Sequence, residues 1–311
     1  MMTRVLPPDE RGLGLAAAIL SDGGLVAFPT ETVYGLGADA RNGRAVAAIY
    51  ETKGRPEFNP LIVHVSSLGT ADIYADIKGP LRKLAEAFWP GPLTLVAPRR
   101  PGPLSDLVTA GLETVAIRVP AHPVARNILD LFDGPVAAPS ANPSGRISPT
   151  TDAHVLAHLD GKIDAIMRAG ACQVGLESTI IGLEGDQPVL LRPGGLPIEV
   201  VAEALMQKIG RPLAETITSP GQLQSHYAPS APLRINAMSP EEGEHWLGFG
   251  PDAYGGSNLS RIGDLREAAA NLFGMLHRLD GGPPIAVASI PEEGLGQAIN
   301  DRLRRAAAPR S

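Results

Sequence analysis

Cysteine is almost absent from this chain of 311 residues, because Cys172 is its only one. A single cysteine cannot form an internal disulfide or a cysteine-rich zinc site, so we expect a protein of the reducing cytoplasm. Aromatic residues are also scarce, at 4% of the sequence. This scarcity argues against a surface that binds nucleic acid by stacking its bases on aromatic rings.

The sequence also lacks long apolar runs and an excess of basic residues. The longest apolar run near the N-terminus covers only residues 15–20, whereas a membrane-spanning helix needs about 20 apolar residues. We therefore expect neither a membrane segment nor a targeting segment. The formal net charge is −6, so the chain does not resemble a basic nucleic-acid-binding protein, and direct tRNA binding is not expected.

Length and composition indicate two folded units. A chain of 311 residues is long enough for two domains, and its 44% of hydrophobic residues exclude a wholly disordered chain. Between residues 211 and 232 the sequence shifts to Pro, Ser, Thr, Gly and Gln without periodic apolar positions, which is typical of a linker. We predict a first domain over residues 1–210, a linker over 211–232 and a small C-terminal α/β domain over 233–311.

Apolar periodicity and turn residues predict helices and strands in both domains. The expected helices of the first domain cover residues 12–21, 44–52, 81–89, 123–131, 152–159 and 197–208. Its expected strands cover residues 25–28, 61–65, 93–97, 114–119, 136–139, 164–168, 178–183 and 188–192. In the C-terminal domain we expect strands at 233–237 and 285–289 and helices at 264–279 and 294–307, whereas residues 246–259 are too rich in glycine to place.

The segment KGRPEFNPLIVH, residues 53–64, is a cationic loop that leads into an apolar strand. Lys53, Arg55 and the amide of Asn59 are the types of group that hold a phosphate chain by charge and hydrogen bond. A solvated turn before a buried strand is the alternative interpretation. His64, at the end of the strand, could equally be an interior histidine with satisfied hydrogen bonds.

A second polar segment follows the expected strand at residues 25–28. We expect the hydroxyls of Thr30, Thr32 and Tyr34 to lie where the chain leaves the sheet. Gly35 and Gly37 would then allow the backbone to approach a ligand closely. The alternative is a polar turn with a packed tyrosine.

Other polar side chains also stand at the ends of short apolar runs, where scaffolds built on strands present functional groups. Thr114 and Arg118 share one face of the strand at 114–119, so the arginine is placed to bind a ligand, with a surface salt bridge as the alternative. Ser140 and Asn142 directly follow the strand at 136–139 and can donate hydrogen bonds. Ser178 and Arg192 occupy comparable positions further along the chain, and Ser148 lies in a loop rich in Ser, Pro and Gly.

Common catalytic signatures are missing. We find no Gly-x-x-x-x-Gly-Lys-Ser/Thr, no Gly-x-Gly-x-x-Gly, no His-Glu-x-x-His, no paired-cysteine metal site and no set of hydroxyl, histidine and acid. The candidate groups are instead cations, hydroxyls and one amide. Such a set binds anions and positions reactants without a covalent intermediate, as phosphate chemistry requires.

Several of these segments, in this order, resemble the YrdC-like family of threonylcarbamoyl-AMP synthases in its longer two-domain form. The segments are residues 25–37, 53–64, 114–120, 137–142, 177–181 and 191–195, with a matching tail at 219–229. The resemblance implies a twisted mixed α/β sheet with a concave ligand face, followed by a small parallel, Rossmann-like α/β domain. It also implies synthesis of L-threonylcarbamoyl-AMP from L-threonine, bicarbonate and ATP, with release of pyrophosphate, for threonylcarbamoyl-adenosine in tRNA.

The resemblance carries over to individual positions of this sequence. It implies catalytic roles for Lys53 and Arg55. The implied ATP-binding residues are Arg55, Asn59, Thr114, Ser140, Ser148, Arg192 and Tyr227. The implied L-threonine-binding residues are Thr32, His64, Arg118, Ala138 through its backbone, and Ser178. Mg²⁺ is expected to enter with ATP without a metal site made by the protein.

Three further expectations follow. A separate tRNA threonylcarbamoyl transferase would consume the product. The linker, with His226 and Tyr227, would act as a lid that closes over the nucleotide. Two alternative functions remain, namely an RNA-binding module of the same fold and a carbamoyltransferase maturation factor, although the latter class carries cysteine-rich zinc segments that one cysteine cannot supply.

Overall fold

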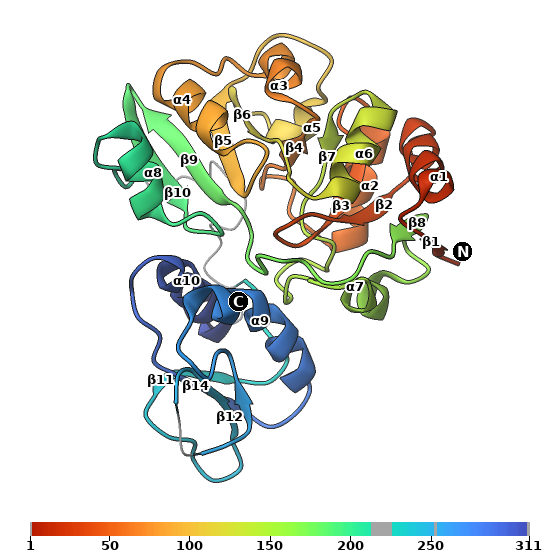
Figure 1. Ribbon diagram of the computed structural model, residues 1–311. Coiled ribbons are helices and arrows are strands. Elements are labelled where there is room, and N and C mark those ends of the chain that lie inside the picture. The colour runs from red at the N-terminus through yellow and green to blue at the C-terminus, as the bar shows by residue number, and fades with distance from the viewer. Residues whose placement is uncertain (1, 213–225, 252–253, 310–311) are drawn as a thin grey trace.

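A computed structural model describes residues 2–212, 226–251 and 254–309 of the chain. The chain forms a large domain built on one extended sheet and a smaller unit below it (Figure 1). Within these ranges, no helix is both long and apolar enough to cross a membrane.

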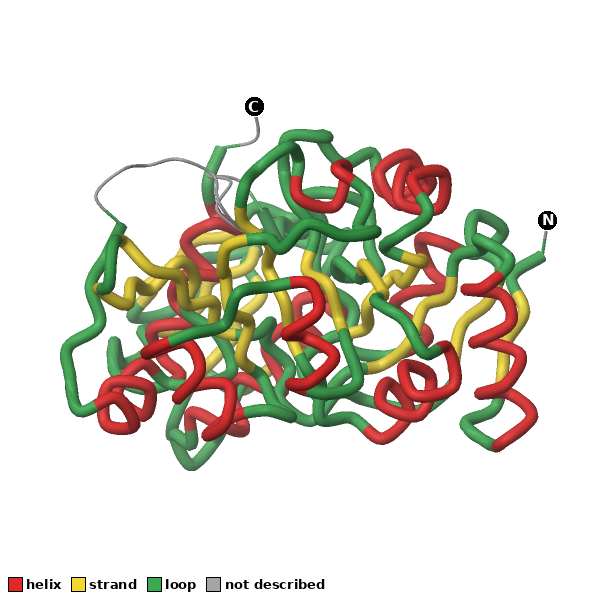
Figure 2. The backbone as a smooth tube through the Cα atoms, turned by 90° about the horizontal axis from the view of Figure 1, so that it is seen from above, coloured by secondary structure: helices red, strands yellow, loops and turns green. Residues whose placement is uncertain are grey.

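The large sheet is mixed and has ten strands in the order β1-β8-β2-β3-β7-β4-β6-β5-β9-β10. Its strands are β1 Arg4–Leu6, β2 Val26–Pro29, β3 Tyr34–Asp39, β4 Ile62–His64, β5 Leu93–Pro98, β6 Thr114–Arg118, β7 Val136–Ala137, β8 Ala165–Met167, β9 Thr179–Glu184 and β10 Gln187–Arg192. Seen from above, these strands follow one another across the molecule, with helices along their flanks (Figure 2). The mixed α/β sheet that the sequence predicts is confirmed.

Neighbouring residues of a strand point to opposite faces of the sheet. Helices pack against the apolar side chains that the strands present. The helices of this domain are α1 Glu10–Ser21, α2 Gly43–Lys53, α3 Leu68–Tyr74, α4 Gly79–Phe88, α5 Asp106–Thr109, α6 Pro123–Phe132, α7 Asp152–Leu159 and α8 Ile198–Leu205. Val63 and Ile117 belong to the largest apolar core, together with residues of α2, α4 and α8. Their neighbours Ile62 and Ala116 belong to a small cluster formed by strand residues alone, so this part of the opposite face is left for a site.

Two sequence-based expectations for the segment after β2 are wrong. Tyr34 does not lie where the chain leaves the sheet but begins β3, which pairs antiparallel with β2. Its side chain is fully buried, and its hydroxyl donates to the carbonyl of Gly170 at 2.8 Å. A Cβ atom on Gly37 would lie 2.6 Å from the Phe28 ring, so packing rather than a ligand requires that glycine. The strands and helices that the sequence did not predict are β1, β3, α3, α5, β12 and β13.

The smaller unit is a parallel α/β unit. Its sheet has the order β11-β14-β12-β13, with β11 Leu233–Ala237, β12 His245–Gly248, β13 Ser257–Asn258 and β14 Ile285–Ala288. Helices α9 Leu265–Leu279 and α10 Leu295–Ala307 lie between this sheet and the large domain (Figure 1). Their apolar core also contains Val33 and Leu176 of the large domain, so one apolar cluster joins the two units.

Candidate functional site

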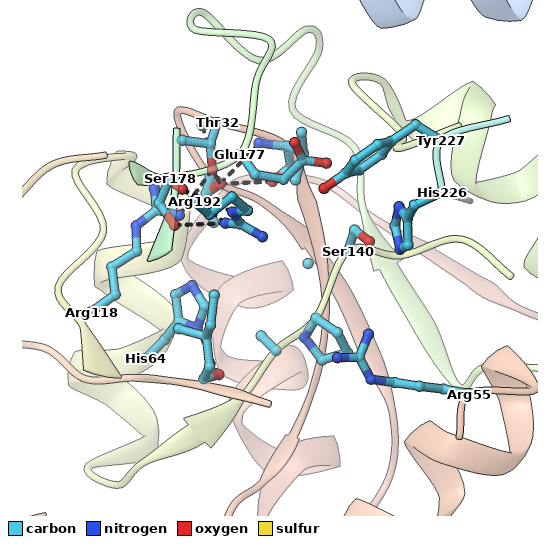
Figure 3. A pocket seen from close by; sticks show the side chains of 16 residues that line it. Thr32, Arg55, His64, Arg118, Ser140, Glu177, Ser178, Arg192, His226 and Tyr227 are labelled. Carbon is cyan, nitrogen blue, oxygen red and sulfur yellow. Dashed lines mark hydrogen bonds between the residues drawn. The ribbon is translucent and has the colours of Figure 1, made fainter. Parts of the chain in front are cut away.

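A pocket lies at the ends of β4 and β6, on the sheet face that carries Ile62 (Figure 3). Its sixteen lining residues are Thr30, Thr32, Val33, Gly35, Arg55, Ile62, His64, Arg118, Ala138, Pro139, Ser140, Glu177, Ser178, Arg192, His226 and Tyr227. Nine of the thirteen site residues expected from the sequence are among them. The other four, Lys53, Asn59, Thr114 and Ser148, are not.

Arg118 ends β6 and is held rigidly at one side of the pocket. It lies beside His64 because parallel pairing places the two residues in register. Its Nε donates to the Gly91 carbonyl at 3.1 Å, its Nη1 to Thr32 Oγ1 at 2.9 Å and its Nη2 to Glu31 Oε1 at 2.6 Å. A guanidinium has five N–H donors, so two remain for a ligand.

Glu31 is a site residue that the sequence analysis missed. It stands between Thr30 and Thr32 directly after β2, a position that could have identified it. Burial alone would raise the pKa of its carboxyl group, but the charge of Arg118 and hydrogen bonds from Arg118 and the Ala121 N–H outweigh burial and lower that pKa. The salt bridge considered for Arg118 therefore exists, but it is buried within the site.

His64 is buried in the pocket wall and is neutral. Burial, with the nearby positive charge of Arg118, lowers the pKa of its imidazole to about 3. A neutral imidazole has one N–H donor and one acceptor nitrogen, and the carbonyl oxygen beside Nδ1 assigns the proton to that atom, so Nε2 can accept from a ligand hydroxyl. Its Nδ1 atom lies 3.3 Å from the Ile62 carbonyl oxygen, which leaves Nε2 as the second polar atom of the ring.

Arg192 and Ser178 form a second fixed group at the ends of β10 and β9. Arg192 donates to the Ser178 carbonyl oxygen from Nη2 at 2.9 Å and from Nε at 3.2 Å. The Ser178 hydroxyl lies 2.7 Å from Thr94 Oγ1 and 3.2 Å from Arg192 Nη2. The turn after Arg192 packs tightly against this group, because a Cβ atom on Gly194 would lie 2.4 Å from the carbonyl carbon of Ser178.

The cationic loop begins where helix α2 ends. Asn42 caps the start of α2 by accepting from two backbone N–H groups, and Gly54 ends the helix in the left-handed conformation that glycine favours. Lys53 Nζ then donates to the carbonyl oxygens of Ser140 at 2.6 Å and Asn142 at 2.5 Å. Burial, together with the charge of Arg55, lowers the pKa of Lys53. Lys53 therefore fixes the loop that carries Ser140 and does not itself line the pocket.

Arg55 lines the pocket and is held by two backbone carbonyls. Its Nε donates to the Asn59 oxygen at 3.1 Å, and its Nη2 donates to the Pro60 oxygen at 2.8 Å. Burial lowers the pKa of Arg55 to about 10, so the guanidinium is charged at neutral pH. The side-chain amide of Asn59 is buried, and neither its nitrogen nor its oxygen has a hydrogen-bond partner among the described residues. Such an amide is suited to a ligand contact.

Thr114 and Ser148 lie outside the pocket for different reasons. Thr114 stands at the other end of β6 from Arg118 and lines a separate cavity with Val96 and Leu191. Ser148 is fully buried behind the pocket wall, where its hydroxyl donates to Glu177 Oε1 at 2.5 Å. Any influence of Ser148 on a ligand therefore passes through Glu177.

His226 and Tyr227, in the C-terminal part of the expected linker, line the pocket (Figure 3). The centres of their rings lie 4.0 Å apart. Tyr227 adopts a positive φ of 63°. This conformation is uncommon for residues other than glycine and indicates that the surrounding structure holds Tyr227 firmly. Residues 213–225 of the expected linker and lid lie outside the described residues. Closure of a lid therefore stays a prediction, whereas the position of Tyr227 in the pocket wall is an observation.

Comparison with known proteins gives one consistent result. Residues 18–194 match the family model described as "Telomere recombination", and residues 197–308 match "Threonylcarbamoyl-AMP synthase, C-terminal domain". The threonylcarbamoyl-AMP synthases of Pyrococcus abyssi and Bacillus subtilis are each 41% identical to this chain, covering 96% and 99% of it and 94% and 96% of their own lengths. The crystal structure of P. abyssi Sua5 complexed with L-threonine matches with a TM-score of 0.90 at 39% identity, covering 99% of this chain and 98% of that one.

We predict that Glu31→Gln lowers the free energy of unfolding by about 3–5 kcal/mol at pH 7, because it leaves the buried Arg118 charge uncompensated. The pKa of Glu31 is lower in the folded chain than its ordinary value of 4.5. Its contribution is therefore complete above that value and is lost as the pH falls through the folded-state pKa. Urea denaturation from pH 7 to pH 3 should show wild type and variant converging in stability.

A matched control removes an exposed carboxylate. Glu86 pairs with Arg82 on helix α4, and its side chain is 58% exposed, so Glu86→Gln should lower stability by at most about 1 kcal/mol. A stability difference between wild type and Glu31→Gln that stays constant down to pH 3 would contradict the ion-pair interpretation.

Proposed function

This chain belongs to the threonylcarbamoyl-AMP synthase family, and from that premise we propose that it is a nucleotidyltransferase that makes L-threonylcarbamoyl-AMP from L-threonine, bicarbonate and ATP. The observation that carries the proposal is the juxtaposition of two binding halves in one buried pocket. Arg118, Thr32 and the neutral His64 form one half. Arg55, Ser140 and Arg192 stand around the other.

The first half suits L-threonine. The two remaining N–H donors of Arg118 suit a carboxylate, because a guanidinium can bind both carboxylate oxygens at once. Thr32 and neutral His64 offer the donors and acceptors that a substrate hydroxyl needs. Ser178 and the Ala138 backbone would complete this half.

The second half suits the phosphates of ATP. Arg55 and Arg192 supply positive charge from buried positions, where electrostatic interactions are stronger than in water. Asn59 would contribute its unpartnered amide, and Lys53 would hold Ser140 in place. Tyr227 lines the pocket and would contact the nucleotide directly. Thr114 and Ser148 stay predictions of nucleotide binding; Ser148 would act through Glu177, and Thr114 lines a separate cavity.

The proposed reaction needs positioning and charge more than covalent catalysis. The amine of threonine and bicarbonate give a carbamate and water. A carbamate oxygen attacks the α-phosphorus of ATP, the bond from that phosphorus to the departing oxygen breaks, and pyrophosphate leaves. Arg55 and Arg192 would stabilise the negative charge that develops on the phosphates, and Lys53 would contribute to catalysis by holding Ser140 in place.

Mg²⁺ would enter with ATP. The described residues contain no group of three or more His, Cys, Asp or Glu side chains that could hold a metal by themselves. Mg²⁺ is usually bound through substrate phosphates, water and at most one or two protein oxygens. The unpartnered amide oxygen of Asn59 would be a candidate for one of these oxygens. Bound there, the ion would neutralise part of the phosphate charge.

We place this chemistry in the cytoplasm, before a separate tRNA threonylcarbamoyl transferase that consumes the adenylate. The adenylate is prone to hydrolysis, so a pocket that excludes water would protect it until transfer.

The experiment that tests the proposal is incubation of the protein with ATP, L-threonine, bicarbonate and Mg²⁺, followed by mass spectrometry for the adenylate. Pyrophosphate release should require threonine and bicarbonate together, because neither alone supplies the carbamate. L-Serine should be a poorer substrate by about tenfold or more, since it lacks one methyl group. Equal pyrophosphate release without threonine would rule the proposal out.

A second prediction separates the two halves of the pocket. Arg118→Ala should raise the KM for threonine at least about tenfold while the Kd for ATP changes little, because the carboxylate fork is lost. Arg44→Ala removes an exposed arginine on helix α2 and should change neither value. If calorimetry shows that Arg118→Ala loses ATP and keeps threonine, the assignment of the halves is reversed.

A further inference from the structure

Arg302 of the smaller unit reaches the edge of the pocket. It lies on helix α10, its side chain is fully buried, and it has the largest volume of any fully buried side chain among the described residues. No local pattern in the sequence distinguishes it from Arg304 and Arg305, which follow on the same helix. The charge of a fully buried guanidinium must be compensated by nearby acidic groups, because an unpaired buried charge strongly destabilises the fold.

The partners of Arg302 connect it to the pocket wall. Its Nε donates to Glu177 Oε2 at 2.8 Å, and its Nη1 donates to the neighbouring Asp301 at 2.7 Å. Its guanidinium carbon lies 5.0 Å from the centre of the Tyr227 ring. Helix α10 also holds the adjacent backbone, because the Arg305 carbonyl accepts from the His226 N–H at 3.2 Å. One helix of the smaller unit therefore supports three pocket residues.

Glu177 is the residue whose charge matters most here. Burial would raise the pKa of its carboxyl group, but the charges of Arg302 and Arg192 and hydrogen bonds from Ser148 and Arg302 outweigh burial and lower it. The carboxylate is therefore ionised, and it lines the space beside Ser178 and Arg192 (Figure 3). A free negative charge at this position would repel the polyphosphate of a nucleotide.

Arg302 and Arg192 act on Glu177 from different places. Arg192 lines the pocket, and its Nε and Nη2 atoms are directed at the Ser178 carbonyl. Arg302 does not line the pocket, so it can neutralise Glu177 without occupying ligand space.

We propose that Arg302 is a positioning residue for the nucleotide: it pairs with Glu177 and so removes the repulsion between that carboxylate and the phosphates. This inference rests on the proposed function, because it assumes a nucleotide in the pocket. It gives the smaller unit a defined role, because the large domain alone would present Glu177 without the charge and the hydrogen bond of Arg302.

The test uses calorimetry with ATP and, separately, with L-threonine. It compares four full-length variants, namely Arg302→Met, Glu177→Gln, the double variant of these two and Arg304→Met. Arg302→Met removes the charge but keeps a long side chain that can still pack on Tyr227. Its Kd for ATP should rise about tenfold or more, with the Kd for threonine within about twofold of wild type. The double variant Arg302→Met with Glu177→Gln should recover most of the lost ATP affinity, because the uncompensated carboxylate is gone. Arg304→Met is the matched control, because Arg304 forms an exposed ion pair with Glu292, and it should bind both ligands like wild type.

The pattern of outcomes decides between a charge effect and simple support of the fold. Equal loss of ATP affinity in the single and double variants, or an Arg302→Met variant that binds ATP like wild type, would overturn the inference. If Arg302→Met does not fold, the double variant is compared with Glu177→Gln: Kd values for ATP within about threefold support the inference, and a larger gap overturns it. Wild-type protein that binds ATP but makes no adenylate would count against the proposed function and leave this comparison intact.

Discussion

An excess of buried positive charge is the constraint on which the rest of this structure depends. In the described ranges, five cationic side chains are buried against two carboxylates; they are Lys53, Arg55, Arg118, Arg192 and Arg302, against Glu31 and Glu177. Each carboxylate is already paired with an arginine. Burying charge is unfavourable unless it is compensated. A polyanion would compensate the buried positive charge that the two carboxylates leave over, and this links the stability of the fold to its proposed substrate.

The fold produces this arrangement by register and by the ends of its elements. Parallel pairing of β4 with β6 puts His64 beside Arg118. The end of helix α2 leads to Arg55, which lines the same pocket, and directs Lys53 at the loop that carries Ser140. The smaller unit contributes Arg302 from helix α10, which packs against the Tyr227 ring and donates to Glu177. The site is thus shared between the two units, consistent with the single apolar cluster that joins them.

The sequence was informative where local signals decide the structure. Strands such as β6 and helices such as α9 follow from apolar periodicity, and polar residues at strand ends, such as Arg118, do line the pocket. What escaped prediction depends on contacts between distant segments. The direction of the Lys53 side chain is set by carbonyls almost 90 residues away, and the ion pair of Glu177 with Arg302 spans 125 residues. The glycines of strand β3 favour a ligand contact when only the sequence is considered. In the structure, Gly37 instead leaves the space that the Phe28 ring occupies.

The most direct test of this account is calorimetric titration of wild-type protein with ATP, with inorganic tripolyphosphate and with adenosine at one salt concentration. If buried positive charge is what the ligand satisfies, ATP and tripolyphosphate should both bind, and adenosine should bind at least about 100-fold more weakly than ATP, a difference of about 2.7 kcal/mol. At equal ligand concentration, the ligand with the lower Kd should also raise the melting temperature more, because the stabilisation grows with the logarithm of ligand concentration over Kd. Adenosine binding as tightly as ATP, with no binding of tripolyphosphate, would contradict the account.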